Sequence, residues 1–195
     1  MRPVLVVALS LGLAASALAE SKKIDLRTKD GVAAINGEWR YSAVKLVEAP
    51  GTDPADKLAT TYDYTPKATG PEFDDSAWPV IDPTTLGKPR GNGRICFAWY
   101  RIKVTVPESA RGKTVVFSTV VDDYGEVWVD GKLPYKGGQT GGAIVAGFNA
   151  PNRLELKGAE PGKVVHIAVF GINGPISAGV TNRIFLGPTT LELVD

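Results

Sequence analysis

The segment from Phe73 to Lys132 constrains the fold of this chain more than any other, because it sets out strands and turns in a recognisable order. From Tyr100 to Val106, apolar residues alternate with Arg101, Lys103 and Thr105. This period of two is typical of a strand that has one face buried and one face in water. The pattern therefore predicts a half-buried strand here, with Arg101 and Lys103 on its wet face.

Two further strands are predicted after it, and they bracket an acidic loop. Thr114 to Val121 is β-branched and apolar, and the run from Glu126 to Val129 stops at Asp130-Gly131, a hairpin-type turn signal. Loops between the strands of a sandwich commonly carry binding residues. The residues between these two strands, which we take as the leading candidates for a site, are Asp122, Asp123 and Tyr124.

The rest of the chain adds short strand-like runs and no sustained helical period. Val164 to Phe170 is apolar on both faces and predicts a central strand, whereas residues 49–72 are rich in Pro and Gly and predict a long surface loop. Many short strands separated by turn residues favour a single all-β domain, a sandwich or jelly roll, over residues 20–195. The other expected strands cover residues 37–47, 144–148, 153–156, 182–186 and 189–194.

The first nineteen residues predict an export signal peptide. Arg2 supplies a positive start, Val4 to Ala15 is a short apolar run, and Ala17-Leu18-Ala19 is a small-x-small cleavage site. The expected location is therefore periplasmic or secreted, and no later segment is apolar enough to span a membrane. The chain has 22 Lys and Arg against 21 Asp and Glu, a balance that argues against nucleic acid as a partner.

The residue types needed for hydrolytic or metal chemistry are scarce. There is one His and one Cys, and the sequence has no Gly-x-Ser-x-Gly motif. His166 lies in an apolar strand and is expected to be a satisfied core residue, and Cys96 is expected to be a small buried apolar residue. Imidazole or thiolate metal sites are therefore disfavoured, and no cofactor is expected. An oxygen-ligated structural calcium ion stays open.

Three motifs in order resemble the sugar-binding domain of family 2 glycoside hydrolases, which has a galactose-binding-like β-sandwich (jelly-roll) fold. They are Phe73 to Trp78 (FDDSAW), Trp99 to Arg101 with Val106-Pro107 at the strand end, and Asp130-Gly131. The resemblance implies that the loop holding Asp122 lies toward the sugar. It also implies that the catalytic carboxylates of such enzymes belong to a separate barrel domain. Asp74 and Asp75 are then expected to make turn and capping hydrogen bonds, and the four Trp residues mainly to pack.

The C-terminal half departs from that family. It has Gly141 to Asn149 where those domains usually carry a Tyr, which puts a contact of that aromatic ring with sugar in doubt. Residues 147–153 and 168–177 are instead similar to a module attached to gluconolactonase-type proteins.

Together these observations predict an exported, non-catalytic carbohydrate-binding module that works alone or with a separate glycoside-processing enzyme. Carboxylates, amides and guanidinium groups pair with sugar hydroxyls, and aromatic faces cover the sugar ring. The alternatives are a glycosidase-like or gluconolactonase-like hydrolase that uses only carboxylates, and a structural or protein-interaction module of the envelope. The leading contacts are Asp122, Asp123 and Tyr124, and the supporting ones are Asn173, Arg183 and Arg94.

Overall fold

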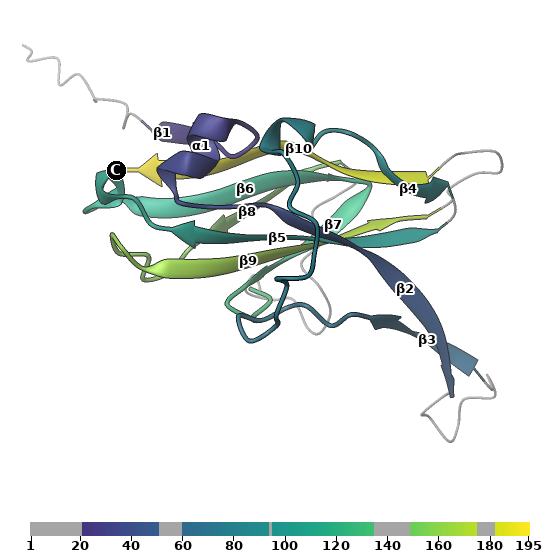
Figure 1. Cartoon of the computed structure of the whole chain (residues 1–195). Helices are drawn as coiled ribbons and strands as arrows, with labels where there is room; N and C mark the ends of the chain where they lie inside the picture. Colours follow the sequence, from purple (N-terminus) through teal and green to yellow (C-terminus); the bar gives the residue numbers. More distant parts are fainter. Residues whose placement is uncertain (1–20, 51–59, 94, 135–148, 175–181) are drawn as a thin grey trace, which may run out of the picture.

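The protein is a sandwich of two antiparallel β-sheets in a computed structural model that describes residues 21–50, 60–93, 95–134, 149–174 and 182–195 (Figure 1). The fold expected from the sequence, an all-β sandwich, is confirmed. None of the helices in these ranges has the length and apolar character that a membrane span needs.

The first sheet has five strands, and β4 pairs with one end of β10. Its members, in order across the sheet, are β1 (Lys22–Asp25), β10 (Asn182–Val194), β6 (Thr114–Asp122) and β8 (Pro151–Glu155), with β4 (Arg90–Gly93) beside β10. The two C-terminal strands expected at 182–186 and 189–194 are one strand, β10, whose register against β6 shifts between Leu186 and Thr189. The irregularity coincides with Gly187-Pro188, where Pro has no N–H to give to a ladder.

The second sheet also has five strands. Their order is β3 (Thr60–Thr65), β2 (Arg40–Pro50), β5 (Cys96–Thr105), β9 (Val164–Asn173) and β7 (Tyr124–Val129). The β9 strand lies inside the sheet, between β5 and β7, and is covered on both faces from Ile167 to Phe170, as predicted. The expected turn at Asp130-Gly131 closes β7 onto Lys132, and both turn residues have positive φ, 47° and 75°. That is the geometry for which Asp-Gly is preferred.

Three short helical segments and three strands were not predicted. The helices are α1 (Lys29–Ala34), η1 (Pro83–Thr85) and η2 (Glu108–Ala110). The strands are β1, β3 and β4. The β3 strand corrects the expected loop at 49–72, because Thr60–Thr65 returns along β2 as a hairpin. Residues 51–59 of that loop and the run expected at 144–148 lie outside the described residues.

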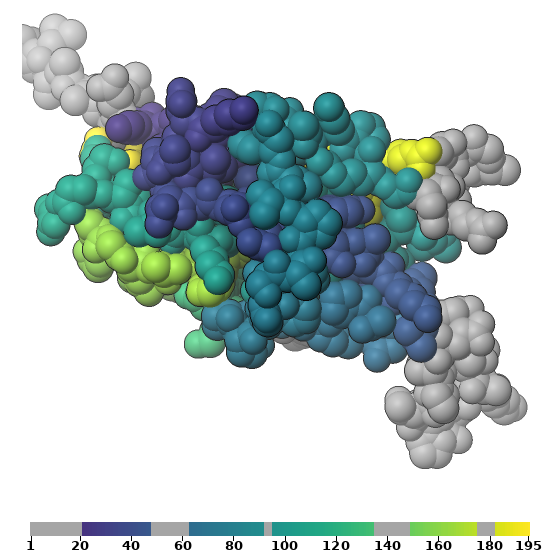
Figure 2. Space-filling model, viewed as in Figure 1, coloured from purple at the N-terminus to yellow at the C-terminus, as the bar shows by residue number. Residues whose placement is uncertain are grey.

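The main core lies between the two sheets and contains Trp39, Tyr100 and Phe117, all at most 1% exposed. A second apolar cluster lies on the outer face of the second sheet, around Trp99 and Phe170. It exists because the chain after β3 crosses that face and then passes to the first sheet, as the blue-teal segment in Figure 2 shows. The Leu186 N–H donates to the carbonyl of Leu86 at the end of this crossing.

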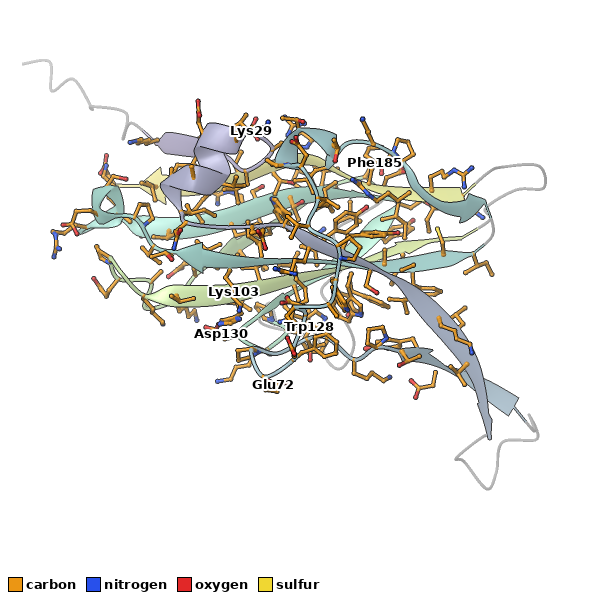
Figure 3. The ribbon with its side chains drawn as sticks, in the orientation of Figure 1. Lys29, Glu72, Lys103, Trp128, Asp130 and Phe185 are labelled. Carbon is orange, nitrogen blue, oxygen red and sulfur yellow. The ribbon has the colours of Figure 1, made fainter. Side chains whose placement is uncertain are left out.

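This crossing segment corrects the expectation that Arg101 lies in water. Arg101 is 3% exposed, because residues 66–78 cover the outer face of β5 at that point. Lys103, two residues further along, is exposed as predicted, and Figure 3 shows it on the outer side of the second sheet. The alternation identified the inner face of β5 correctly. Its outer face is exposed to water only beyond the crossing segment, at Lys103.

Candidate functional site

The predicted acidic loop forms the corner where β6 of the first sheet passes into β7 of the second. Asp122 is the last residue of β6 and pairs with Phe185 of β10, labelled in Figure 3. Tyr124 is the first residue of β7 and pairs with Ile172 of β9. The intervening Asp123 is buried, and Tyr124 is 37% exposed. The corner therefore joins the ends of both sheets.

Asn173 and Arg183, named from the sequence as supporting contacts, lie at the same end of the sandwich. The Asn173 Nδ2 donates to the carbonyl of Arg183 over 2.6 Å, which ties the end of β9 to the start of β10. Arg183 Nη1 donates to the carbonyl of Gly91 in β4, also over 2.6 Å. Five of the six predicted site residues are thus brought to one end of the molecule. The sixth, Arg94, lies outside the described residues.

The two carboxyl groups at the corner are less acidic than ordinary aspartates. Burial raises the pKa of Asp122, although hydrogen bonds from Asn149 and from Asp123 oppose the shift. Burial also raises the pKa of Asp123, and repulsion from the neighbouring Asp122 adds to it. Two carboxyl groups in hydrogen-bonding contact titrate as a pair. The Asp122 and Asp123 carboxyl groups can accept hydrogen bonds from hydroxyl groups, and they hold a proton more readily than exposed acids do.

Cys96 lies between this corner and the interior. It pairs with Asn173 across β5 and β9 and is half-buried against the main core, which corrects the expectation of a buried residue. Burial raises the pKa of the Cys96 thiol; the positive charge of Arg183 opposes this shift, and the carboxylates of Asp123 and Asp122 add to it. The thiol is therefore held away from the reactive thiolate form.

A cavity of about 300 Å³ opens next to Cys96, between β2 and β5 on one side and β4 and β10 on the other. The residues that shape it include Tyr41, Arg90, Phe97 and Ile184. The Arg90 side chain is half-buried and lies over the Tyr41 ring, with its Cζ atom 5.5 Å from the ring centroid. The volume is at the lower end of the range of small-molecule sites, roughly 300–1,000 Å³.

Sequence reasoning did not find this cavity. The exposed Ala43 and the buried Ala98 form a cross-strand pair that lines it, and their small side chains leave space beside Tyr41. An alternating run shows that Tyr41 and Ala43 share a face, but only the register between β2 and β5 shows that two alanines meet. The cavity could therefore have been found only from the pairing of Ala43 with Ala98 in neighbouring strands, and not from a local sequence motif.

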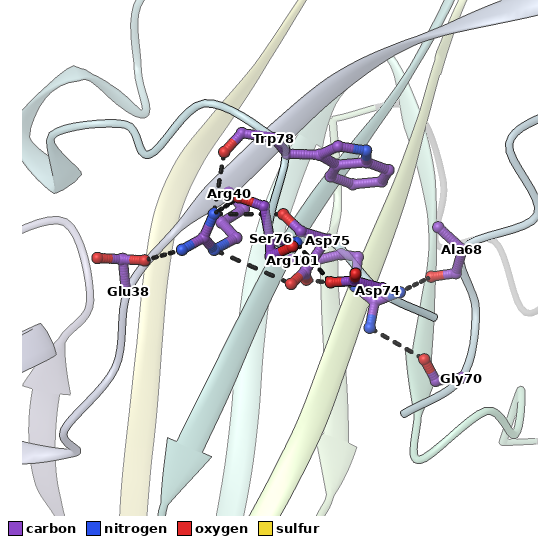
Figure 4. Close-up of polar contacts among 9 residues, drawn as sticks. All are labelled: Glu38, Arg40, Ala68, Gly70, Asp74, Asp75, Ser76, Trp78 and Arg101. Carbon is purple, nitrogen blue, oxygen red and sulfur yellow. Dashed lines mark hydrogen bonds and ion pairs between the residues drawn. The ribbon is translucent and has the colours of Figure 1, made fainter. Parts of the chain in front are cut away.

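The FDDSAW motif has a structural role, shown in Figure 4. Asp74 accepts a hydrogen bond from the Ser76 N–H over 2.9 Å, which is the expected turn contact. Asp75 differs from the expectation, because its Oδ2 forms an ion pair with Arg101 Nε at 2.9 Å. Arg101 Nη1 donates to the carbonyl of Ala68 at 2.8 Å, and Arg101 Nη2 donates to the carbonyl of Gly70 at 2.9 Å. These contacts fasten the crossing segment to β5.

His166 lies on the outer face of the second sheet, away from the acidic corner. It pairs with Lys103, and its backbone N–H donates to Asp130 Oδ1. The expectation of a satisfied core histidine is wrong: the residue is half-buried, and its buried Nδ1 has no hydrogen-bond partner among the described residues. Burial, followed by the charge of Lys103, lowers the His166 pKa.

The tryptophans are packing residues, as expected. Trp39 and Trp99 are at most 1% exposed, and Trp78 and Trp128 are partly buried against the outer cluster. Within the described ranges, no group of three or more His, Cys, Asp or Glu side chains is placed to hold a metal ion. The structural calcium ion considered from the sequence stays a prediction.

Comparisons with known proteins identify the fold. No protein-family model and no curated protein matches the sequence. Among solved structures, the chain is similar to a calcium-binding mutant of Bacteroides uniformis β-glucuronidase 2, with 13% identity and a TM-score of 0.53. It is also similar to a Bacteroides uniformis β-glucuronidase, with 15% identity and a TM-score of 0.53. Each match covers 89% of this chain and 18% of the other chain.

At these identities the likeness shows the fold alone. The resemblance to family 2 glycoside hydrolases is confirmed at that level, because this chain has the β-sandwich of one part of such enzymes. The similarity to a module of gluconolactonase-type proteins stays a prediction.

Proposed function

We propose that this protein is an exported, non-catalytic carbohydrate-binding module that serves glycoside hydrolysis, either alone or beside a separate enzyme. One observation carries the proposal: carboxyl, guanidinium and aromatic side chains gather at one end of the sandwich, next to a cavity of about 300 Å³. The carboxyl groups come from Asp122 and Asp123, the guanidinium from Arg183, and the aromatic surface from Tyr41. Export rests on the N-terminal segment and is part of the proposal.

Sugar is the ligand class that best fits this combination. A sugar ring offers hydroxyl groups, which both donate and accept hydrogen bonds, together with a weakly polar C–H face. Carboxyl oxygens at the corner accept from hydroxyls, the Arg183 guanidinium donates to hydroxyls, and the half-buried Tyr41 gives apolar contact. The corner, β9 and β10 are held together by paired strands and by the hydrogen bond between Asn173 and the Arg183 carbonyl.

The same geometry disfavours bond cleavage. The carboxyl groups of a glycosidase stand about 5 to 9.5 Å apart, on either side of the bond that is broken. Asp122 and Asp123 instead hydrogen-bond to each other. The Cys96 thiol has a raised pKa, and His166 lies on the outer face of the second sheet, so neither makes a nucleophile and base pair with the other.

Isothermal titration calorimetry of the purified protein against mono- and oligosaccharides tests the proposal. We expect saturable heat for at least one sugar, and a loss of affinity of about ten- to a hundredfold on Asp122→Asn, because a charged hydrogen-bond acceptor becomes neutral. Asp30→Asn, which makes the same change on exposed α1, is the matched control and should bind as the parent does. No heat for any sugar at millimolar concentration would reject a carbohydrate module. Turnover of gluconolactone or an aryl glycoside that is lost in Asp122→Asn would replace it with a hydrolase.

A further inference from the structure

The wall of the cavity beside Cys96 is mostly apolar and carries one charge. Ala43, Ala98 and Ile184 contribute apolar surface, and the guanidinium of Arg90 forms part of the same wall. None of the described residues that line the cavity is an Asp or a Glu, so the acidic corner lies outside it. Within the described residues, the cavity therefore has a cation in its wall and no anion.

The Arg90 guanidinium has hydrogen-bond partners that are neutral. It donates to the carbonyl of Lys88 and to the hydroxyl of Thr85, each over 3.0 Å. No Asp or Glu in the described ranges forms an ion pair with Arg90. Because this half-buried charge is already partly removed from water, an anion that reaches it gains more than it would at an exposed arginine.

The two tyrosine rings beside the guanidinium stay uncharged. The Arg90 Cζ lies 5.5 Å from the centroid of the Tyr41 ring and 5.8 Å from that of the Tyr100 ring. Burial raises the pKa of both phenols, although the charge of Arg90 opposes each shift. Neither phenol ionises at neutral pH to neutralise Arg90. The rings and the hydrogen bonds instead hold the guanidinium in place, so it loses little conformational entropy when an anion binds.

The composition of the wall favours one class of anion. A polyhydroxylated ligand inside the cavity would press most of its hydroxyls against apolar side chains, and a buried hydroxyl without a partner is costly. A phosphate brings up to two negative charges to a single cation. A carboxylate brings one charge and matches the planar guanidinium, and an apolar body matches the surface of Ala43, Ala98 and Ile184.

We infer that this cavity binds a small monocarboxylic acid with an apolar body, such as an aromatic acid, with its carboxylate against Arg90. The inference goes beyond the proposed function, because it gives the cavity a ligand of its own and leaves the sugar at the acidic corner outside it. The volume of about 300 Å³ is at the lower end of small-molecule sites, so it suits a body of one ring rather than a long chain.

Calorimetry with four probes at one pH and ionic strength tests the class of ligand. The probes are sodium benzoate, benzamide, sodium acetate and sodium D-glucuronate. We expect saturable heat with benzoate, and an affinity about ten- to a hundredfold above that of benzamide, which has the ring without the charge. Acetate lacks the apolar body and glucuronate replaces it with hydroxyls, so both should bind about tenfold more weakly than benzoate, or less.

The thiol of Cys96 reports where the ligand sits. Cys96 is the only cysteine of the chain and lines the cavity, so alkylation by N-ethylmaleimide, followed by mass spectrometry, modifies one known place. Benzoate at a concentration that saturates the calorimetric signal should slow this alkylation. Acetate at the same concentration should leave the rate unchanged.

Arg90→Gln tests the role of the charge directly. It should lower the affinity for benzoate to that for benzamide and leave benzamide binding unchanged. Arg111→Gln removes the same charge from an exposed site, where Arg111 pairs with Glu108, and should bind benzoate as the parent does.

A second pair of variants leaves the guanidinium and its contacts intact. Ile95 lines the cavity and is 52% exposed, so a polar residue there should not disturb the core. Ile95→Asp adds a negative charge beside the site, whereas Ile95→Asn has nearly the same shape without the charge. Ile95→Asp should bind benzoate about two- to fivefold more weakly than Ile95→Asn, and the two variants should bind benzamide equally.

The results can overturn each part of the inference. Equal affinity of the parent for benzoate and benzamide, or of the two Ile95 variants for benzoate, would remove the role of the charge. Acetate or glucuronate binding as tightly as benzoate would remove the apolar body. Benzoate binding that leaves the Cys96 alkylation rate unchanged would place the ligand outside the cavity, and the absence of saturable heat with benzoate would refute the inference as a whole. The carbohydrate module is tested separately, by the sugar titrations of the parent and of Asp122→Asn.

Discussion

The ion pair between Asp75 and Arg101 on the outer face of the second sheet should contribute about 3 kcal/mol to stability, because both side chains are largely buried. The side chains are 11% and 4% exposed, so Asp75→Asn leaves an almost fully buried guanidinium without its counter-charge. Breaking one side of a buried ion pair costs about 3–5 kcal/mol. The carbonyls of Ala68 and Gly70 still accept from Arg101, which places the expected loss near the lower end, about 3 kcal/mol.

Urea denaturation followed by circular dichroism measures this loss. The same loss corresponds to a fall in Tm of roughly 6–12 °C for a domain of this size. The neighbouring Asp74→Asn is a matched control, because Asp74 is exposed and an Asn side chain can accept the same hydrogen bond from Ser76. It should change the free energy of unfolding by less than about 0.5 kcal/mol.

A double-mutant cycle decides whether the charge itself is responsible. Arg101→Met removes the cation and leaves the buried Asp75 carboxylate with only the longer contact to Arg40 Nε at 3.9 Å, so each single variant loses its main counter-charge. The double variant should lose less than the sum of the two single losses. Additive losses, or a loss below about 1 kcal/mol for Asp75→Asn, would refute the reasoning that this pair holds the crossing segment on β5.

Two further predictions concern pH. The hydrogen bond from Arg153 holds the pKa of Glu192 below its usual 4.5, so Glu192→Gln should cost about 1 kcal/mol at pH 7. This difference should shrink as the pH falls through the lowered pKa, and urea denaturation that shows the same difference at pH 3 would contradict it. Burial, followed by the charge of Lys103, lowers the His166 pKa from 6.5, with Asp130 acting in the opposite direction. The protein should therefore lose stability as the pH falls from 6.5 toward the lowered pKa. His166→Gln should flatten denaturation midpoints between pH 7.5 and about 5, and an unchanged slope would count against this assignment.

Much of the fold could be predicted because its signals are local. The alternation in β5, the apolar run of β9 and the Asp-Gly turn after β7 each depend on residues within a few positions of one another. The β3 and β4 strands could not be found in this way. They are short strands, β3 at the edge of its sheet and β4 paired at one end of β10, in segments rich in Thr, Gly and Asn, whose pairing with β2 and β10 is set by distant residues.

The site divides in the same way. The sequence alone determined that Asp122, Asp123 and Tyr124 lie where one strand passes into the next, because the apolar runs on either side must enter the core. Only the tertiary structure decided that Asn173 and Arg183 meet that corner, since those contacts depend on how β9 and β10 are registered in different sheets.

The same distinction explains Arg101 and the cavity. A strand pattern shows which side chains share a face, but not what covers that face. The crossing segment buries Arg101, and the meeting of Ala43 with Ala98 opens the space beside Arg90. The alternation of buried and exposed side chains is a property of one strand and can be predicted from the residues of that strand. Register and coverage are properties of pairs of segments far apart in the chain, so the packed protein alone determines them.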